Sequence, residues 1–148
     1  MKKIKAYLDR VIEKLLITIF GLMVINVIWQ VITRYFSENP SSFTDELSRY
    51  LMIWLGILGA AYVTGKNEHV SIEYFIKKSS VQNRKILTLF ITLSIICFAI
   101  ITLVIGGGRL VYITLILEQY SPSLKIPLAF VYSVLPISGI LIIFYKIT

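Results

Sequence analysis

The sequence predicts an all-α membrane protein with four transmembrane helices, and three observations support this prediction. The 148 residues are 57% hydrophobic and only 16% charged, whereas soluble domains carry about a quarter charged residues. Four apolar stretches each approach the roughly 20 residues that a spanning helix needs. None of them resembles the short alternating strands of an outer-membrane barrel. The net charge of +7 therefore indicates basic loops beside a membrane, and no nucleic-acid partner is expected.

The whole chain, residues 1–148, is expected to form a single membrane domain. The expected spans cover residues 15–33, 47–64, 86–105 (with an extension to 117 left open) and 126–145. The extension would carry Arg109 to the outer interface, because it lies 24 residues, about 36 Å of helix, beyond Lys85. Asp9 and Glu13 precede the first span and no small-x-small cleavage site follows it, so we expect it to be retained.

Two further segments have the spacing of amphipathic helices that lie in the membrane interface. One is the N-terminal tail, where apolar residues recur at helical intervals between lysines, and the other is in the second loop. The apolar residues are Ile4, Tyr7, Leu8, Val11, Ile12 and Leu15 in the tail, and Val70, Ile72, Phe75 and Ile76 in the loop.

The distribution of Lys and Arg predicts the orientation of the chain. These residues are concentrated in the N-terminal tail and in residues 66–85, whereas the first and third loops carry few of them. Because basic loops stay on the cytoplasmic side, both termini and the second loop should be cytoplasmic. The segment TDELSR, residues 44–49, then lies outside, at the start of the second span.

The TDELSR segment has two interpretations. Asp45 and Glu46 suit the positive end of a helix, and Thr44 is a suitable N-cap. Asp45 can also pair with Arg49 four residues later, so the simpler interpretation is a well-formed helix start. The alternative is an outer rim that holds the spans together or contacts a partner, since charges at a membrane boundary commonly mark contacts. This rim would comprise Arg34, Asp45, Glu46, Arg49 and Arg109.

Polar and small residues within the spans predict faces that pack against other helices. Asn26, Gln30 and Thr33 form a polar stripe on the first span, which is costly against lipid. Gly56 and Ala60 form a small-xxx-small pair that lets another backbone approach closely. The expected helix-packing face comprises Asn26, Gln30, Thr33, Gly56, Gly59 and Ala60. The glycine triplet 106–108 is expected to loosen or bend the third span, and Pro136 to kink the fourth.

Taken together, the motifs of this chain occur in an order that is informative over nearly its whole length. They are Trp29-Gln30 with Arg34-Tyr35, the segment 43–49, Trp54 with Gly59-Ala60, Lys66 with the segment 68–73, the segment 121–127, and Tyr132 with Leu135-Pro136. This order resembles the small membrane subunit, of the DctQ type, of tripartite ATP-independent periplasmic (TRAP) transporters. That family often has Trp, Glu, Arg and Asp where Phe43, Asp45, Lys66 and Glu73 stand here, which are conservative departures.

The resemblance implies a small accessory subunit of a sodium-driven importer of carboxylates in the bacterial inner membrane. A large membrane subunit would carry the sodium and substrate sites, so no cofactor is expected on this chain. The small subunit would pack against that large subunit within the lipid bilayer. It would also offer part of the surface on which a periplasmic substrate-binding protein docks. Nothing in this chain selects among dicarboxylates, keto acids, sugar acids and sialic acids.

Two other classes of function were weighed against this one. An autonomous four-helix transporter acting as a dimer would need a carboxylate embedded in an early helix, and the first span offers only amides. A membrane enzyme or cytochrome subunit would need ligands, but His69 is the only histidine and no zinc-ligand cluster is present in the sequence. We interpret Lys66, Glu68 and His69 as residues of the cytoplasmic interface, and we do not expect an enzyme.

Overall fold

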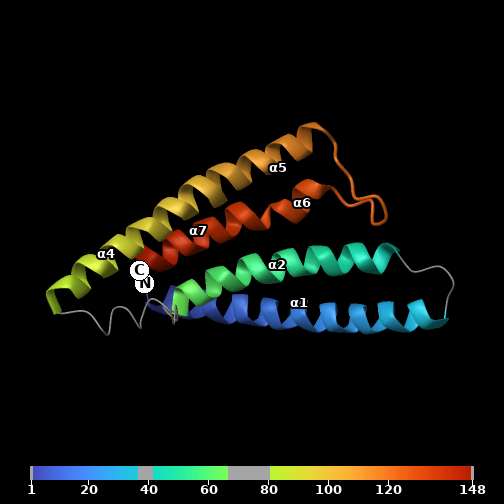
Figure 1. Cartoon of the computed structure of the whole chain (residues 1–148), viewed down its shortest axis with the longest axis horizontal. Coiled ribbons are helices and arrows are strands. Elements are labelled where there is room, and N and C mark those ends of the chain that lie inside the picture. Colours follow the sequence, from blue (N-terminus) through green and yellow to red (C-terminus); the bar gives the residue numbers. More distant parts are fainter. Residues whose placement is uncertain (1, 37–41, 67–80, 148) are drawn as a thin grey trace.

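The computed structural model describes residues 2–36, 42–66 and 81–147, and these residues form long helices (Figure 1). The elements are α1 (Lys2–Phe36), α2 (Ser42–Lys66), α4 (Val81–Phe98), the π-helix η1 (Ala99–Gly106), α5 (Gly107–Ile116), α6 (Leu128–Tyr132) and α7 (Val134–Ile147). Four helical stretches are long and apolar enough to cross a membrane: Lys3–Phe36, Ser42–Lys66, Lys85–Ile116 and Leu128–Ile147. The predicted all-α membrane class is therefore confirmed.

The N-terminal tail and the first span form one unbroken helix. Helix α1 has 35 residues, which corresponds to about 52 Å at 1.5 Å per residue. The expected amphipathic helix of the tail is thus the first part of α1, and no break lets it turn away as a separate element. Its residue Ile12 is buried within the chain. The amphipathic segment expected at residues 70–78 lies outside the described residues.

The helices are arranged side by side, with α2 between two neighbours. Helix α2 packs against α1 and against α7, and α7 in turn packs against η1 (Figure 1). Two clusters of buried side chains hold this arrangement together. One joins Ala61, Ala99, Leu103 and Ile142, and the other joins Ile19, Leu58 and Val134. The N- and C-terminal ends of the chain lie at the same end of the molecule.

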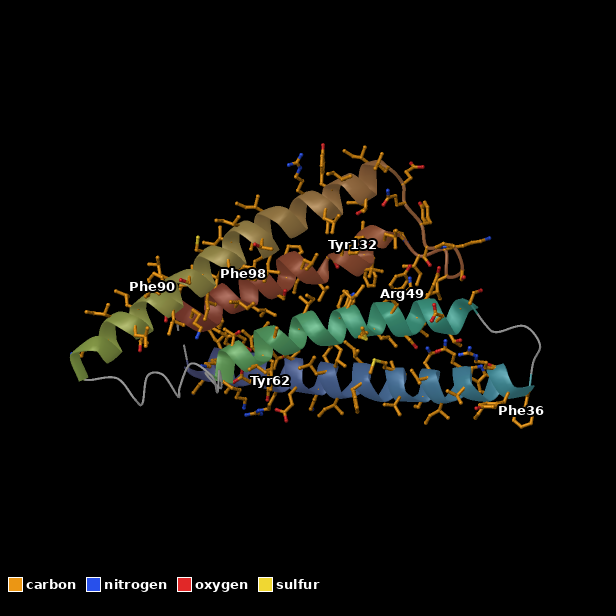
Figure 2. All side chains as sticks on the ribbon, in the orientation of Figure 1. Phe36, Arg49, Tyr62, Phe90, Phe98 and Tyr132 are labelled. Atoms are coloured by element: carbon orange, nitrogen blue, oxygen red, sulfur yellow. The ribbon has the colours of Figure 1, made fainter. Side chains whose placement is uncertain are left out.

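The outer sides of the helices carry exposed apolar side chains. Phe90 is 68% exposed and lies on the outer side of α4 (Figure 2), and Phe98 is 58% exposed. Such side chains would be unfavourable in water but suit a hydrocarbon environment, where lipid tails are as apolar as the side chains themselves. The exposure pattern therefore agrees with a multi-pass membrane protein.

The third span extends beyond residue 105, in agreement with the predicted extension of this helix towards residue 117. Residues 81–116 are continuously helical, and the π-helical segment η1 ends at Gly106, the first glycine of the triplet. The glycines do not adopt left-handed backbone angles; Gly107 has φ −63°. Instead, Gly107 allows a close approach, because an added Cβ would lie 2.7 Å from the Cβ of Leu135. The loosening appears as the change from π to α register at this point.

The fourth span is interrupted one turn before Pro136. Proline has no N–H to donate, so the carbonyl of Tyr132 loses its helical partner. Helix α6 accordingly ends at Tyr132 and α7 begins at Val134, with Ser133 in a turn between them. The N–H of Ile137 restores the helical ladder by donating to the carbonyl of Ser133 at 3.3 Å. The expected irregularity is present, although it lies nearer the start of the span than its middle.

Close packing of α7 on the third span predicts the effect of a single methyl group. In Gly139→Ala, the new Cβ would lie 2.8 Å from the Cβ of Leu103 and 3.3 Å from the carbonyl oxygen of Ala99. We expect a loss of about 1–3 kcal/mol in the free energy of unfolding, as in other overpacked cores. Thermal unfolding in mild detergent measures it. The matched control is Gly21→Ala, whose Cβ would meet nothing within 4 Å; equal effects of the two changes would contradict the expectation.

Candidate functional site: the polar network at the start of α2

Helix α2 begins earlier than expected. Its first residue is Ser42, so the prediction that Thr44 is the N-cap was wrong. Thr44 lies inside the first turn and is 2% exposed. Its burial follows from the packing of this turn against α1, where the carbonyl oxygen of Thr44 accepts a hydrogen bond from a neighbouring amide.

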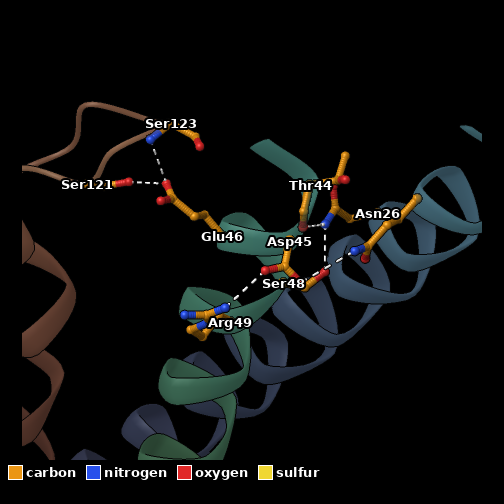
Figure 3. A network of polar contacts seen from close by, with 9 residues as sticks. Asn26, Thr44, Asp45, Glu46, Ser48, Arg49, Ser121 and Ser123 are labelled. Atoms are coloured by element: carbon orange, nitrogen blue, oxygen red, sulfur yellow. Dashed lines mark hydrogen bonds and ion pairs between the residues drawn. The ribbon is translucent and has the colours of Figure 1, made fainter. Parts of the chain in front are cut away.

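Asn26 joins α1 to α2. Its Nδ2 donates to the carbonyl oxygen of Thr44 and to the Oγ of Ser48, both at 2.7 Å (Figure 3). Gln30, one turn further along α1, donates to the Oδ1 of Asp45 at a longer 3.5 Å. Thr33 donates within its own helix, to the carbonyl oxygens of Trp29 and Gln30. The polar stripe of the first span therefore faces protein, but its partner is α2 of the same chain.

Glu46 binds the loop between α5 and α6. Its Oε2 accepts a hydrogen bond from the Oγ of Ser121 and from the backbone N–H groups of Ser123 at 3.1 Å and Leu124 at 3.2 Å (Figure 3). Hydrogen bonds to a charged carboxylate are stronger than those between neutral groups. This contact connects residues 75 to 78 positions apart in the sequence.

The loop has a backbone shape that presents these donors. Glu118 has φ 45° and Lys125 has φ 53°, so left-handed residues stand on both sides of the bonded turn. Such angles are uncommon for residues other than glycine. The N–H of Ser121 donates to the carbonyl of Ile126, and the N–H of Lys125 donates to the carbonyl of Ser121. The turn is thus closed on itself and offers its remaining N–H groups to Glu46.

Asp45 and Arg49 form an ion pair on the exposed side of α2. Arg49 Nη2 lies 3.0 Å from Asp45 Oδ2, and the two side chains are 66% and 58% exposed, respectively. The i,i+4 pairing is as predicted, but an exposed pair of this kind contributes only about 0–1 kcal/mol. Asp45 thus pairs with Arg49 and accepts only the long hydrogen bond from Gln30 of α1, whereas Glu46 makes the contact that connects α2 to the loop before α6.

Arg34 and Arg109, the other two residues of the expected rim, make no contact with this network within the described residues, and a role for the rim in binding a partner stays a prediction. Both are exposed, and neither forms an ion pair within the described parts of the chain. Arg109 is on α5, which packs against α6 and η1 rather than against α2. Arg34 lies beyond Gln30, the last residue of the polar stripe that reaches α2. The positions of the helices, rather than the charges of the side chains, therefore determine which residues take part in the network.

The small residues expected to pack against another helix are open. An added Cβ at Gly56 or Gly59 would meet nothing within 4 Å among the described residues, and Ala60 is exposed. Gly56 and Ala60 share one face of α2 with other exposed residues, at spacings of three and four. These residues are Asp45, Arg49, Met52, Gly56, Ala60 and Val63. This face, which we call the open face of α2, runs the length of the span.

A second polar cluster lies at the opposite end of the molecule, where α1, α2 and α7 converge. The hydroxyl of Tyr62 donates to Glu13 at 3.3 Å, and Lys5 lies 5.8 Å from the ring of Tyr145. Lys66, predicted to be at the cytoplasmic interface, lies 5.3 Å from the ring of Tyr62. Glu68 and His69 lie outside the described residues. Among the residues that are described, no group of three or more His, Cys, Asp or Glu side chains could hold a metal ion.

The comparisons with known proteins decide the family. The family model described as "Tripartite ATP-independent periplasmic transporters, DctQ component" matches residues 23–148. The chain belongs to the DctQ family. A putative TRAP transporter small permease protein of Haemophilus influenzae is 34% identical over 145 residues, covering 96% of this chain and 86% of that protein. The predicted family is therefore confirmed.

The names of two further relatives of this DctQ chain include sialic acid. The sialic acid TRAP transporter small permease protein SiaQ of Vibrio cholerae is 22% identical over 150 residues, covering 99% of this chain and 83% of that protein. The sialic acid TRAP transporter permease protein SiaT of Haemophilus influenzae is 29% identical over 79 residues, which is 53% of this chain but only 12% of that protein. The DctQ chain is thus a multi-pass component of a transporter.

The Glu46 contact predicts a difference between two neighbouring acids. Glu46→Gln keeps the side-chain shape but removes the charge that the Ser121–Leu124 turn binds, so we expect a clear drop in the thermal midpoint. Asp45→Asn and Arg49→Ala disturb the exposed pair and, at Asp45, the long exposed hydrogen bond from Gln30, so each should cost about 1 kcal/mol or less. Thermal unfolding of the purified variants in detergent compares them.

One result of the same series would contradict this prediction. If Arg49→Ala destabilises the protein as much as Glu46→Gln does, then Asp45 and Arg49 belong to a buried ion network and the assignment to an exposed pair is wrong. Ser121→Ala provides the matched change on the loop side, and combined with Glu46→Gln it should be less than additive because the two residues share one contact.

Proposed function

We propose that this chain is the small accessory subunit of a heteromeric importer, and that it stabilises a large transport subunit without translocating solute itself. The observation that carries this proposal is the DctQ match over residues 23–148, together with a small permease relative of which the chain covers 86%. It has no role as an enzyme in this proposal. The proposed location is the bacterial inner membrane, with both termini in the cytoplasm.

Similarity to SiaT supports a large membrane partner. A segment resembling about half of this chain makes up only 12% of SiaT, which is itself named a permease. A segment joined covalently to a much longer permease is held close to it in the membrane. We therefore propose that the separate DctQ chain packs against a large permease subunit in the same way, with lipid around the remaining surface.

The open face of α2 is the surface proposed for this partner. In the described residues, α1 and α7 cover the other sides of α2, whereas the face from Asp45 to Val63 stays exposed. Gly56 and Ala60 allow a second helix backbone to come close, which favours van der Waals packing in lipid. The Asp45–Arg49 pair stands at one end of this face, where it would meet polar groups at the membrane boundary.

The substrate and the driving ion are proposed to belong to the partner subunit. The proposed substrate class is a carboxylate, such as the sialic acid named for two relatives, and the proposed driving force is a sodium gradient. Sodium would bind the large subunit, and the DctQ chain would bind none. A periplasmic binding protein is proposed to deliver the substrate to the outer end of the complex, where Glu46 fixes the loop of residues 117–127 beside α2.

Reconstitution tests whether the chain acts alone. Purified DctQ chain in liposomes, with an imposed sodium or proton gradient, should give no uptake of sialic acid or a dicarboxylate. Liposomes that contain the large subunit, the DctQ chain and the binding protein should take up the substrate when sodium is present outside. Gradient-driven uptake by the DctQ chain alone would contradict the proposal and would favour an autonomous dimeric transporter.

Substitution of Gly56 tests the open face. In Gly56→Leu the side chain has space within the DctQ chain, because no described atom lies within 4 Å of the added Cβ. We therefore expect unchanged thermal stability of the isolated chain, but weaker co-purification with the large subunit, since the leucine holds the backbones apart.

The control for this experiment is Gly21→Leu, at a glycine of α1 that is equally open but outside the proposed face. Its co-purification yield should stay at the wild-type level. Wild-type yield for Gly56→Leu as well would mean that the open face of α2 contacts lipid and that the large subunit binds elsewhere.

A further inference from the structure

The outer parts of the third and fourth spans form a single unit, which we call the outer arm. It comprises α5, the loop of residues 117–127 and α6, and α5 packs along α6 (Figure 1). Backbone hydrogen bonds join the two sides of the loop. The N–H of Leu128 donates to the carbonyl of Gln119 at 2.9 Å, and the N–H of Ser121 donates to the carbonyl of Ile126 at 2.9 Å. Because these bonds connect one side of the arm to the other, we expect the arm to move as one piece.

The arm joins the rest of the chain at two irregular points, and these points touch each other. On the third span, the π-helix η1 changes to α5 at Gly107. On the fourth span, Ser133 separates α6 from α7, and Pro136 has no N–H to continue the helical ladder. Gly107 lies against Leu135 and Pro136, because an added Cβ would be 2.7 Å from the Cβ of Leu135. Glycine, proline and π-helical segments are where helices bend, so both spans can bend at the same level.

On the side of this level nearer the chain termini, the two spans are firmly packed. Gly139 of α7 lies so close to η1 that an added Cβ would be 2.8 Å from the Cβ of Leu103. Val134, the first residue of α7, is fully buried in a cluster with Ile19 of α1 and Leu58 of α2. Helix α7 is therefore fixed to three other helices up to the residue that follows the interruption.

On the other side of this level, the arm is attached less firmly. Glu46 binds its tip, and the ring of Trp54 stacks on that of Phe130 with centroids 5.6 Å apart. Beside this stack, an apolar groove of about 440 Å³ lies between the arm and α1, with Ile126 and Phe130 on one side and Leu15 on the other. The position of the arm against α2 therefore depends strongly on the Glu46 contact.

We propose that the outer arm is hinged, with its pivot at Gly107, Ser133 and Pro136, and that the Glu46 contact is the latch that holds it against α2. When the latch opens, the arm swings away from α2 while η1 and α7 keep their positions, since a hinge concentrates the backbone change in a few residues at the ends of helices. The hinge is a property of this chain by itself and does not depend on the partner subunits proposed above.

Distances between pairs of spin labels, measured by double electron–electron resonance on the full chain in liposomes, test this proposal. The single native cysteine is first removed by Cys97→Ser. The outer pair is Ile28→Cys on α1 with Ile116→Cys at the end of α5, and the inner pair is Ile17→Cys on α1 with Ile140→Cys on α7. All four positions are exposed. With the latch intact, each pair should give one narrow distance distribution.

Opening the latch should lengthen only the outer distance. Ile116 lies nine residues beyond Gly107, so a rotation of about 15° moves this end of the roughly 14 Å helix by about 4 Å. Glu46→Ala should therefore shift the outer distribution to longer distances by about 4 Å and leave the inner one unchanged. Asp45→Ala is the matched control, because its carboxylate does not bind the loop. It should leave both distributions as they are.

Stiffening the pivot should reverse the effect. In the Glu46→Ala chain, Gly108→Ala restricts the backbone of α5 without a clash, because its Cβ would meet nothing within 4 Å. Pro136→Ala restores an N–H at the interruption of the fourth span. Together these two changes should remove most of the shift of the outer pair. Gly21→Ala, at an equally open glycine of α1, should not.

Ser121→Ala keeps the test informative if Glu46→Ala does not fold. It removes one of the three donors to Glu46, so it should give a smaller shift of the outer pair in the same direction. The proposal is overturned if neither latch variant changes the outer distance, or if the inner pair shifts as much as the outer pair. It is also overturned if the stiffened chain keeps the full shift, since the bend would then lie elsewhere.

Discussion

The carboxylate of Glu46 is bound at a point where a hydroxyl and two backbone N–H groups of the 121–124 turn converge. Non-helical backbone near a membrane needs partners for its polar groups, and this turn is the longest described stretch between helices. Glu46 supplies them from the first turn of α2. The contact therefore fixes the second helical hairpin relative to α2, and α2 in turn is fixed to α1 through Asn26.

Irregularities of the third and fourth spans match each other in space. The π-helical segment η1 packs against α7, where the missing side chain of Gly139 admits Leu103 and Val104. About one turn before Gly139 on α7, Leu135 and Pro136 follow the interruption at Ser133. Gly107 packs against these two residues. Each irregularity alone would weaken its helix, because it disturbs the regular hydrogen-bond ladder. Packed together, they let the two helices approach more closely than regular helices with larger side chains could.

Local patterns in the sequence were sufficient to predict part of this structure. Hydropathy located the four spans, since a bilayer requires a long apolar helix at each crossing. The pair of Asp45 and Arg49 followed from i,i+4 spacing on one helix. The hydrogen bond that Ser121 donates to Glu46 did not follow from such a pattern, because it depends on how two hairpins dock and not on any short spacing. Likewise, the stripe of Asn26 indicated a protein partner but could not say that this partner was α2. Arg109 lies near the start of α5, and α6 lies between that helix and α2.

The unbroken length of α1 has a mechanical consequence. From Lys2 to Leu15 the helix rises about 20 Å, which exceeds the depth of roughly 5–8 Å that the headgroup region adds on one side of the core. The first turns of α1 nevertheless lie beside other helices, because Glu13 accepts a hydrogen bond from Tyr62 of α2 and Lys5 lies 5.8 Å from the ring of Tyr145 of α7. The helix has no break before its apolar part. Its charged first turns are therefore held against the ends of α2 and α7 as a continuation of the span, and not as a separate element lying on the membrane surface.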